Sequence, residues 1–172
     1  MPRSASACAA GMRLRIAAKL AEPAEREYFR ACVEPLLGRD AEYVGEVGGD
    51  EKWELLGGAT CLLNPLRWSE PFGMVMIEAL ATGTPVVGTA NGSVPEIVTD
   101  GVNGFIGVSE RQLADATRRA ELLDRSTCRR IVADEFSITR MVREHVRLFE
   151  AAALRERRTP AVAATAQPAV LA

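Results

Sequence analysis

The amino-acid sequence predicts an α/β fold in which helices cover both faces of a doubly wound, Rossmann-like parallel sheet. Up to Ile106, short apolar segments of strand length alternate with segments whose apolar residues follow a helical spacing. Strands that alternate with helices pair in parallel, because each parallel connection needs a crossover element. From Ser109 onward the apolar spacing is helical only, so we expect no further strands.

The expected elements follow one another in a regular order. Apolar and basic residues alternate from Met12, which suits a strand, and a helical pattern follows. Asp50 stands where an N-cap would begin the second helix, Gly83 where a glycine would close the third, and Pro85 at the start of a strand. We expect strands over residues 12–18, 42–45, 60–63, 84–88 and 105–106, and helices over residues 25–37, 51–56, 72–81, 109–123, 126–133 and 138–154.

Composition argues against several classes of function. The 172 residues contain 21 Lys and Arg against 23 Asp and Glu, a formal net charge of −2, which gives no general attraction to nucleic acids or anionic membranes. The apolar stretches are far shorter than the roughly 20 residues that span a bilayer. Arg13 and Arg15 interrupt the first apolar segment, unlike a secretory signal. We expect a cytoplasmic protein with no transmembrane segment and no nucleic-acid partner.

The cysteines argue against a metal site. Cys8, Cys32, Cys61 and Cys128 are spread singly, with no Cys-x-x-Cys pair and no histidine at zinc-ligand spacing. We interpret each as a reduced thiol that fills a small apolar space.

The segment after the third strand predicts an anion site. Pro71 fixes the backbone before a helix, and Gly73 removes a side chain from its first turn, so the N–H groups of residues 72–75 are expected to face outward. A helix N-terminus offers such donors together with about half a positive charge, which suits a phosphate. The preceding strand ends at the same place, where open α/β sheets bind ligands.

Two carboxylates flank this predicted anion site. Glu70 precedes the helix and Glu78 lies within it, about 12 Å away at about 1.5 Å per helical residue. Glycosidase pairs lie at roughly 5–9.5 Å, so an acid–base pair is disfavoured. An ionised carboxylate accepts hydrogen bonds from two hydroxyls, so one Glu could bind a sugar and the other a ribose, with a diphosphate between them. Glu78 lies in an otherwise apolar helix, where an unpaired carboxylate is costly, which also favours a ligand role.

Four motifs in this region resemble the retaining glycosyltransferases of family 4, which have the two-domain GT-B fold. They are Glu70-Pro-Phe-Gly-Met-Val-Met-Ile-Glu78, the strand start Ala-Thr-Gly-Thr-Pro-Val-Val, the loop Gly-Ser-Val-Pro-Glu and the turn Asp-Gly-Val-Asn-Gly-Phe. The resemblance runs from about Gly11 to Phe149 and covers the C-terminal, donor-binding domain of the family. It implies a glycosyltransferase that uses a nucleoside-diphosphate sugar, needs no cofactor or metal and retains the anomeric configuration.

The resemblance also implies roles for individual residues. Glu70 would contact the transferred sugar as the catalytic residue, and Glu78 would bind the ribose hydroxyls. Val47 would lie against the base, and Lys19 and Lys52 are additional candidates for contact with the donor. The backbone of the helix start would meet the phosphate and sugar, through Phe72, Gly73, Met74 and Val75.

Compared with the family, the chain lacks an N-terminal acceptor domain and the first strand of the donor domain with its basic segment. The resemblance therefore predicts a sheet that lacks a central strand, and an open edge of that kind invites pairing with another chain. We expect residues 1–154 to form the nucleotide-sugar-binding domain and residues 155–172, which have no periodicity, to be a disordered tail. A truncated or mis-started frame is favoured over a partner chain that supplies the remainder.

Other interpretations stay open for the function and for single residues. A noncatalytic remnant that binds a nucleotide or a partner chain is the main alternative, and a GT-B epimerase or phosphorylase fits the Glu-Pro-Phe-Gly helix start less well. The donor sugar, base and acceptor are undetermined. Trp68 is expected to pack beside a strand end, His145 to lie on a polar helix surface, and Glu96 to be a first-turn helix charge.

Overall fold

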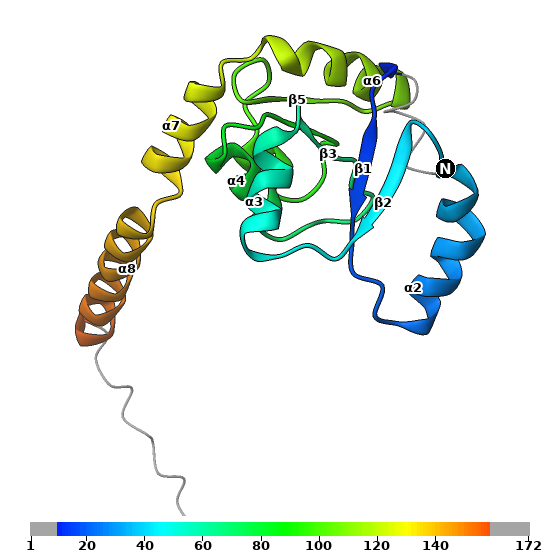
Figure 1. The fold of residues 1–172 in the computed structure, drawn as a ribbon. Coiled ribbons are helices and arrows are strands. Elements are labelled where there is room, and N and C mark those ends of the chain that lie inside the picture. Colours follow the sequence, from blue (N-terminus) through cyan, green and yellow to red (C-terminus); the bar gives the residue numbers. More distant parts are fainter. Residues whose placement is uncertain (1–9, 159–172) are drawn as a thin grey trace, which may run out of the picture. The chain divides into compact units, whose positions relative to one another are not determined.

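The computed structural model describes residues 10–158 as two units, divided after Glu135. Figure 1 shows the course of the chain. Residues 1–9, which include Cys8, and residues 159–172, on which most of the expected tail falls, lie outside the described residues. The second unit is described by its helix α8 (Ile138–Arg158), which continues four residues past the expected domain end at 154.

The first unit alternates strands and helices. In chain order these are β1 (Leu14–Ala17), α2 (Pro23–Tyr28), a π-helical turn (Phe29–Val33), a 3-10 turn (Glu34–Leu36), β2 (Ala41–Gly45), α3 (Gly49–Gly58), β3 (Leu62–Asn64), α4 (Met74–Ala81), β4 (Val86–Gly88), α5 (Val94–Ile97), β5 (Gly104–Ile106), α6 (Glu110–Arg119), a 3-10 turn (Ala120–Leu122) and α7 (Arg125–Glu135).

All strand pairs of the first unit are parallel, which confirms the predicted α/β class. They form two sheets, one with the order β1-β2 and one with the order β3-β4-β5. The five described strands therefore do not join into one continuous sheet, as expected for a sheet that lacks a central strand. Each sheet keeps open edges, because β1 pairs only with β2 and β3 only with β4 among the described residues.

The core of the three-stranded sheet is buried on both faces. Val87 packs with Phe105 of β5 and with Leu113 of α6, and its neighbour Val86 points to the opposite face because strand side chains alternate. Both valines are 0% exposed. Helix α4 contacts β3 and β4 and contributes the fully buried Met76. This covering of both faces is typical of a doubly wound fold.

Polar contacts join the helices to the start of β4. The guanidinium of Arg125, at the start of α7, donates to the carbonyl oxygens of Gly57 and Ala59 at 2.6 and 2.9 Å and to Thr84 Oγ1 at 2.8 Å. Thr84 Oγ1 in turn donates to the carbonyl of Leu56 at 2.6 Å. These bonds satisfy carbonyls at the C-terminal end of α3 and fix α3, β4 and α7 together.

Several local predictions need correction. Helix α3 begins at Gly49 with Gly48 as its N-cap, so Asp50 lies in the first turn rather than at the cap. The first helix begins at Pro23 because the side chains and backbones of Glu22 and Glu25 form a capping box before the apolar pattern starts. Cys128 is fully buried, as predicted for a small filler, whereas Cys32 is exposed and fills no apolar space.

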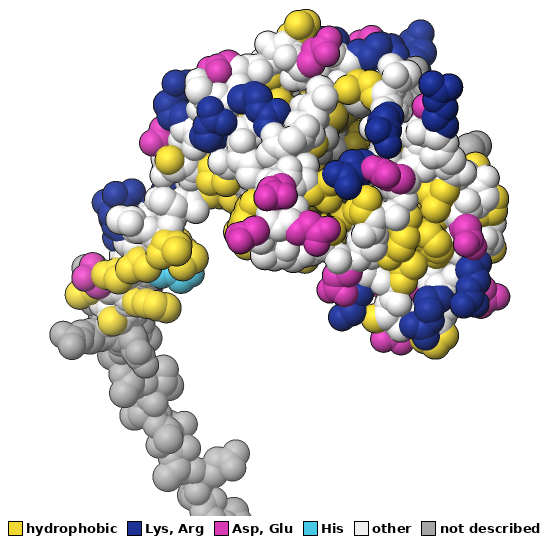
Figure 2. Space-filling view, viewed as in Figure 1, with side chains coloured by type: hydrophobic (Ala, Val, Ile, Leu, Met, Phe, Trp, Pro, Cys, Tyr) yellow, Lys and Arg dark blue, Asp and Glu magenta, His cyan; other side chains and the backbone are white. Residues whose placement is uncertain are grey.

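Helix α8 is amphipathic and carries many exposed apolar side chains. Figure 2 shows hydrophobic side chains gathered beside the histidine on this helix. The apolar residues exposed by about half or more are Ile138, Met141, Val142, Val146, Leu148, Phe149 and Leu154. None of the helices in residues 10–158 combines the length and apolar character needed to cross a bilayer.

Candidate functional site

The candidate site centres on the N-terminus of α4. Gly73 is the N-cap and has left-handed backbone angles, φ 75° and ψ 49°. The helix therefore begins at Met74, two residues later than predicted, because a left-handed residue cannot belong to a right-handed helix. The side chains of Met74 and Val75 are 58% and 39% exposed. Their N–H groups find no hydrogen-bond acceptor among the described residues, so they are free to bind an anion.

The carboxylate of Glu70 binds the backbone just before this helix in the structure. Its Oε1 accepts hydrogen bonds from the N–H groups of Phe72 at 3.4 Å and Gly73 at 3.2 Å. The prediction that the N–H groups of residues 72–75 all face outward unobstructed is therefore wrong for these two. A carboxylate at a helix N-terminus is stabilised by the helix dipole, so Glu70 has a structural contact in addition to any ligand role.

The loop before α5 holds the backbone of Glu70 in place. The N–H of Ser93 donates to the carbonyl oxygen of Glu70 at 2.9 Å. Gly92 has a φ of 54°, and a Cβ at this position would collide with the backbone N and O of Glu70. Only glycine permits so close an approach, which gives the Gly-Ser-Val-Pro-Glu motif a positioning role. Glu96 is exposed in the first turn of α5, as predicted.

Ser93 is a residue of the site that sequence reasoning missed. Its hydroxyl is buried and has no hydrogen-bond partner in the described structure. A Cβ added to Gly73 would come within 3.1 Å of the Ser93 Oγ, so the hydroxyl lies directly behind the start of α4. Only its place in the Gly-Ser-Val-Pro-Glu motif could have drawn attention to it.

Glu78 has a cationic partner, which the sequence reasoning did not foresee. Lys52 of α3 approaches Glu78 Oε1 to 2.6 Å, and the two side chains are 30% and 20% exposed. Glu78 is therefore not the unpaired carboxylate that the apolar sequence of its helix suggested, and its ligand role stays a prediction. Glu78 Oε2 has no partner among the described residues, so it is free to accept a further hydrogen bond.

The remaining predicted site residues lie apart from these contacts. Val47 is half-buried in the loop between β2 and α3, and Lys19 is exposed just after β1. No hydrogen bond or ion pair joins Lys19 to Glu70 or Glu78. Trp68 is 54% exposed, so the prediction that it packs beside a strand end is wrong.

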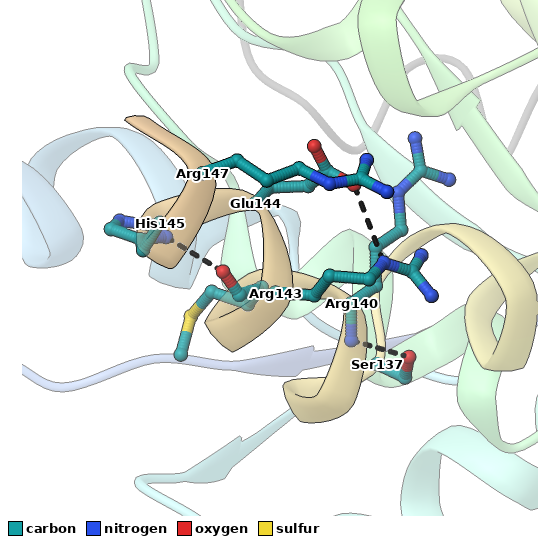
Figure 3. A network of polar contacts seen from close by, with 7 residues as sticks. Ser137, Arg140, Arg143, Glu144, His145 and Arg147 are labelled. Carbon is teal, nitrogen blue, oxygen red and sulfur yellow. Dashed lines mark hydrogen bonds and ion pairs between the residues drawn. The ribbon is translucent and has the colours of Figure 1, made fainter. Parts of the chain in front are cut away.

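His145 lies on the exposed surface of α8, as predicted. Its Nδ1 lies 2.8 Å from the carbonyl oxygen of Met141. The rings of His145 and Phe149 are arranged edge to face. Figure 3 shows the imidazole on the side of the helix away from Arg143, Glu144 and Arg147. Glu144 forms an ion pair with Arg147 at 3.0 Å. These contacts form a polar network on the surface of α8.

Two cavities of the first unit lie away from the two carboxylates. A cavity of about 530 Å³ lies between β5 and α6, and a smaller one lies near Ala59 and Pro85. Neither is lined by Glu70 or Glu78. Among the described residues, no three His, Cys, Asp or Glu side chains gather as metal ligands would.

Comparison with known proteins first gives partial sequence matches. A 41.2 kDa uncharacterised protein of the cps region of Klebsiella pneumoniae is 32% identical over 99 residues, which cover 52% of this chain and 26% of that protein. The D-inositol 3-phosphate glycosyltransferase of Streptomyces griseus is 48% identical over 60 residues, which cover 35% of this chain and 12% of that enzyme. The matches therefore span a minor part of each relative.

Solved structures match most of this chain. AviGT4, a glycosyltransferase of avilamycin A biosynthesis, has a TM-score of 0.67 at 29% identity over 86% of this chain and 45% of its own. Sucrose-phosphate synthase from Thermosynechococcus elongatus gives 0.68 at 25% identity over 87% and 42%. Anabaena HepE in complex with UDP shares the fold, with a TM-score of 0.74 at 20% identity over 87% and 44%.

The comparisons agree with the geometry of the first unit. The chain spans less than half the length of these solved structures, and its two parallel sheets with flanking helices correspond to one Rossmann-like half of the GT-B fold. The model of one protein family matches residues 8–134, a range that includes Glu70, Glu78 and the loop that holds the backbone of Glu70. Because this match covers more than half of the chain, the chain belongs to that family, which is described as glycosyl transferases group 1.

Proposed function

We propose that this chain is the donor-binding half of a retaining glycosyltransferase of family 4. It would take a nucleoside-diphosphate sugar and transfer the sugar to an acceptor that another domain or a partner chain binds. The observation that carries the proposal is the start of α4, where the free N–H groups of Met74 and Val75 lie between Glu70 and Glu78 along the chain. Membership of the glycosyl transferases group 1 supports it.

The N-terminus of α4 would hold the diphosphate of the donor. Two free N–H groups and the helix dipole provide the donors and the partial positive charge that a phosphate needs. Glu70 occupies the N–H groups of Phe72 and Gly73 in the structure, and an arriving phosphate would repel its carboxylate. We expect Glu70 to turn away from the helix and to accept hydrogen bonds from the sugar hydroxyls instead.

Glu78 would bind the ribose of the donor. Its Oε2 is free to accept a hydroxyl, because Lys52 engages only Oε1. The proposed division of roles also places Val47 against the base and Lys19 near the phosphates. In the proposed reaction, the bond from the anomeric carbon to the phosphate oxygen breaks on the face where the acceptor oxygen bonds. The acceptor proton passes to the leaving phosphate, and the configuration is retained.

A titration of the purified chain with UDP, GDP and ADP tests the donor site. We expect saturable binding of one of them in calorimetry, together with a rise in melting temperature. Glu78→Ala should abolish this binding, whereas Glu70→Ala should keep it and lose sugar transfer in a reconstituted two-domain enzyme. Glu110→Ala removes an exposed carboxylate from the first turn of helix α6, outside the four motifs, and serves as the matched control.

Two results would contradict the proposal. Unchanged nucleotide affinity in Glu78→Ala, with an intact circular dichroism spectrum, would remove the ribose assignment. Full transfer activity in Glu70→Ala would remove the catalytic assignment.

A noncatalytic nucleotide-binding role is the second candidate. It is favoured by one observation, that both carboxylates already have partners within this chain, Glu70 at the start of α4 and Glu78 at Lys52. Turnover discriminates the two candidates. Sugar transfer by the chain with any acceptor would exclude the noncatalytic role, and nucleotide binding without turnover, even after addition of an acceptor domain, would establish it.

A further inference from the structure

The pair of Lys52 and Glu78 joins two helices next to the proposed donor site. Lys52 lies in the first turn of α3 and Glu78 in the second turn of α4. They are 26 residues apart in the chain, yet Lys52 Nζ donates to Glu78 Oε1 at 2.6 Å. Such a charge-assisted hydrogen bond is about twice as strong as one between neutral groups. It is also sheltered, because both side chains are more than two-thirds buried.

The lysine itself is fixed on its other side. Its Nζ lies 4.6 Å from the centroid of the Trp53 ring, a distance at which a cation is attracted to the face of an indole. A flexible lysine side chain is thus held between an aromatic ring and a carboxylate. Removing this lysine would leave the Glu78 carboxylate without a hydrogen-bond or ion-pair partner among residues 10–158.

The contact controls how Glu78 can act on a ligand. With Oε1 held by Lys52, the carboxylate is restricted to orientations that keep this contact and leave Oε2 open to a ligand. Ordering this oxygen before a ligand binds reduces the entropy that binding must overcome.

We propose that Lys52 is a positioning residue for Glu78, and that recognition of the ribose 2′-hydroxyl depends on this lysine. The inference rests on the proposed function, because it assumes that Glu78 binds the ribose of a nucleoside diphosphate. In this proposal Lys52 acts through the carboxylate, in place of the direct donor contact that the family resemblance implies for it. Its removal should therefore affect a ribonucleotide far more than the corresponding 2′-deoxyribonucleotide.

The experiment compares UDP, GDP and ADP with their 2′-deoxy forms by calorimetry. The wild type should prefer the ribonucleotide about tenfold, the effect of one hydrogen bond to a charged group. In the Lys52→Met variant this preference for the ribonucleotide should fall below about twofold. The Lys52→Arg variant, which keeps a cation beside Glu78, should retain most of the preference. Arg15→Met is the matched control, since it removes an ion pair of similar length, 2.7 Å to Glu42 on the β1-β2 sheet, and should leave the preference unchanged.

The outcomes separate positioning from other roles of Lys52. An equal loss of affinity for ribo and deoxy forms would show a direct ligand contact or a general disturbance, and would overturn the proposal. An unchanged preference in Lys52→Met would overturn it as well.

A second measurement tests the pair without any ligand. Unfolding of Lys52→Met, Glu78→Gln and the double variant gives the coupling between the two side chains. We expect a coupling factor of about fivefold in the unfolding equilibrium, near the upper end for measured ion pairs. A factor below about twofold would overturn the proposal. A wild type that binds none of the nucleotides would instead contradict the proposed function, and the coupling would still decide whether Lys52 holds Glu78.

Discussion

Two glycines determine the backbone at the candidate site, each for a different reason. Gly73 needs its left-handed backbone to begin α4, and the side chains of Met76 and Ser93 close the space that a Cβ would occupy. Gly92 needs its bare Cα because the backbone of Glu70 lies against it. The backbone at the start of α4 and the backbone of Glu70 are therefore held in place by two residues that have no side chains.

Replacing Gly73 tests this at the residue scale. Gly73→Ala should destabilise the fold by about 2–5 kcal/mol, because left-handed backbone costs an alanine about 1–2 kcal/mol and overpacking adds about 1–3 kcal/mol. Gly101 has a similar φ of 74° and open space around its Cα. Gly101→Ala should therefore show the backbone cost alone. Urea unfolding of both variants gives the comparison, and equal losses would contradict the crowding described around Gly73.

The pairing of Glu78 shows what sequence alone leaves open at this scale. The motif identified both carboxylates, and the structure places both at α4. The partner of Glu78 lies 26 residues away on another helix, and no spacing rule links positions at that separation. The contact of Glu70 with the N–H groups of Phe72 and Gly73 could not be predicted either, because it depends on the left-handed angles of Gly73.

At the scale of elements, apolar periodicity predicted most of the fold. Each of the five strands overlaps its expected range, and the long helices lie where their spacing placed them. The boundaries were less predictable, because hydrogen bonds at the ends of elements set them. The capping box of Glu22 and Glu25 moves the start of α2 to Pro23, and Gly48 rather than Asp50 caps α3.

The N-terminus of α7 illustrates such a boundary. Asp124 accepts hydrogen bonds from the backbone and side chains of Ser126 and Thr127, at 2.7 to 3.2 Å. The side-chain bond from Ser126 is the largest of the causes that lower the pKa of Asp124 from 3.8 to about 2. A carboxylate with a lowered pKa stabilises the fold above its unfolded pKa, and this contribution is lost as the pH falls through the folded value.

A pH series of melting temperatures tests this capping role. At pH 7, Asp124→Ala should melt a few degrees below the wild type, because the first N–H groups of α7 lose their acceptor. The difference should shrink as the pH falls from about 4 toward about 2, where the wild-type carboxylate becomes protonated. Glu54→Ala, which removes an exposed carboxylate of α3, is the control. A difference that stays constant down to pH 2 would exclude the ionised cap as the cause.

At the scale of the whole molecule, two features favour association with other chains. The open edges of the two sheets expose backbone donors and acceptors. The strands β1 and β3 contain only four and three residues, however, and short edge strands pair weakly. Helix α8 exposes a longer apolar surface, which includes Val142 at 52% and Phe149 at 70%. Exposed apolar surfaces of this kind mark interaction sites.

We therefore expect helix α8 to be the main cause of self-association in solution. Burying half a dozen of its apolar side chains would contribute about 10 kcal/mol, which is comparable to the roughly 4–15 kcal/mol that association costs. Sedimentation should therefore show weak, concentration-dependent association of the wild type. The double variant Val142→Gln with Phe149→Gln should stay monomeric at the same concentrations. Arg143→Gln with Arg147→Gln, which changes the polar residues of the same helix, should associate like the wild type. Association that survives in the Val142 and Phe149 variant would assign the contact to the sheet edges instead, because those backbone groups are unchanged by the substitutions.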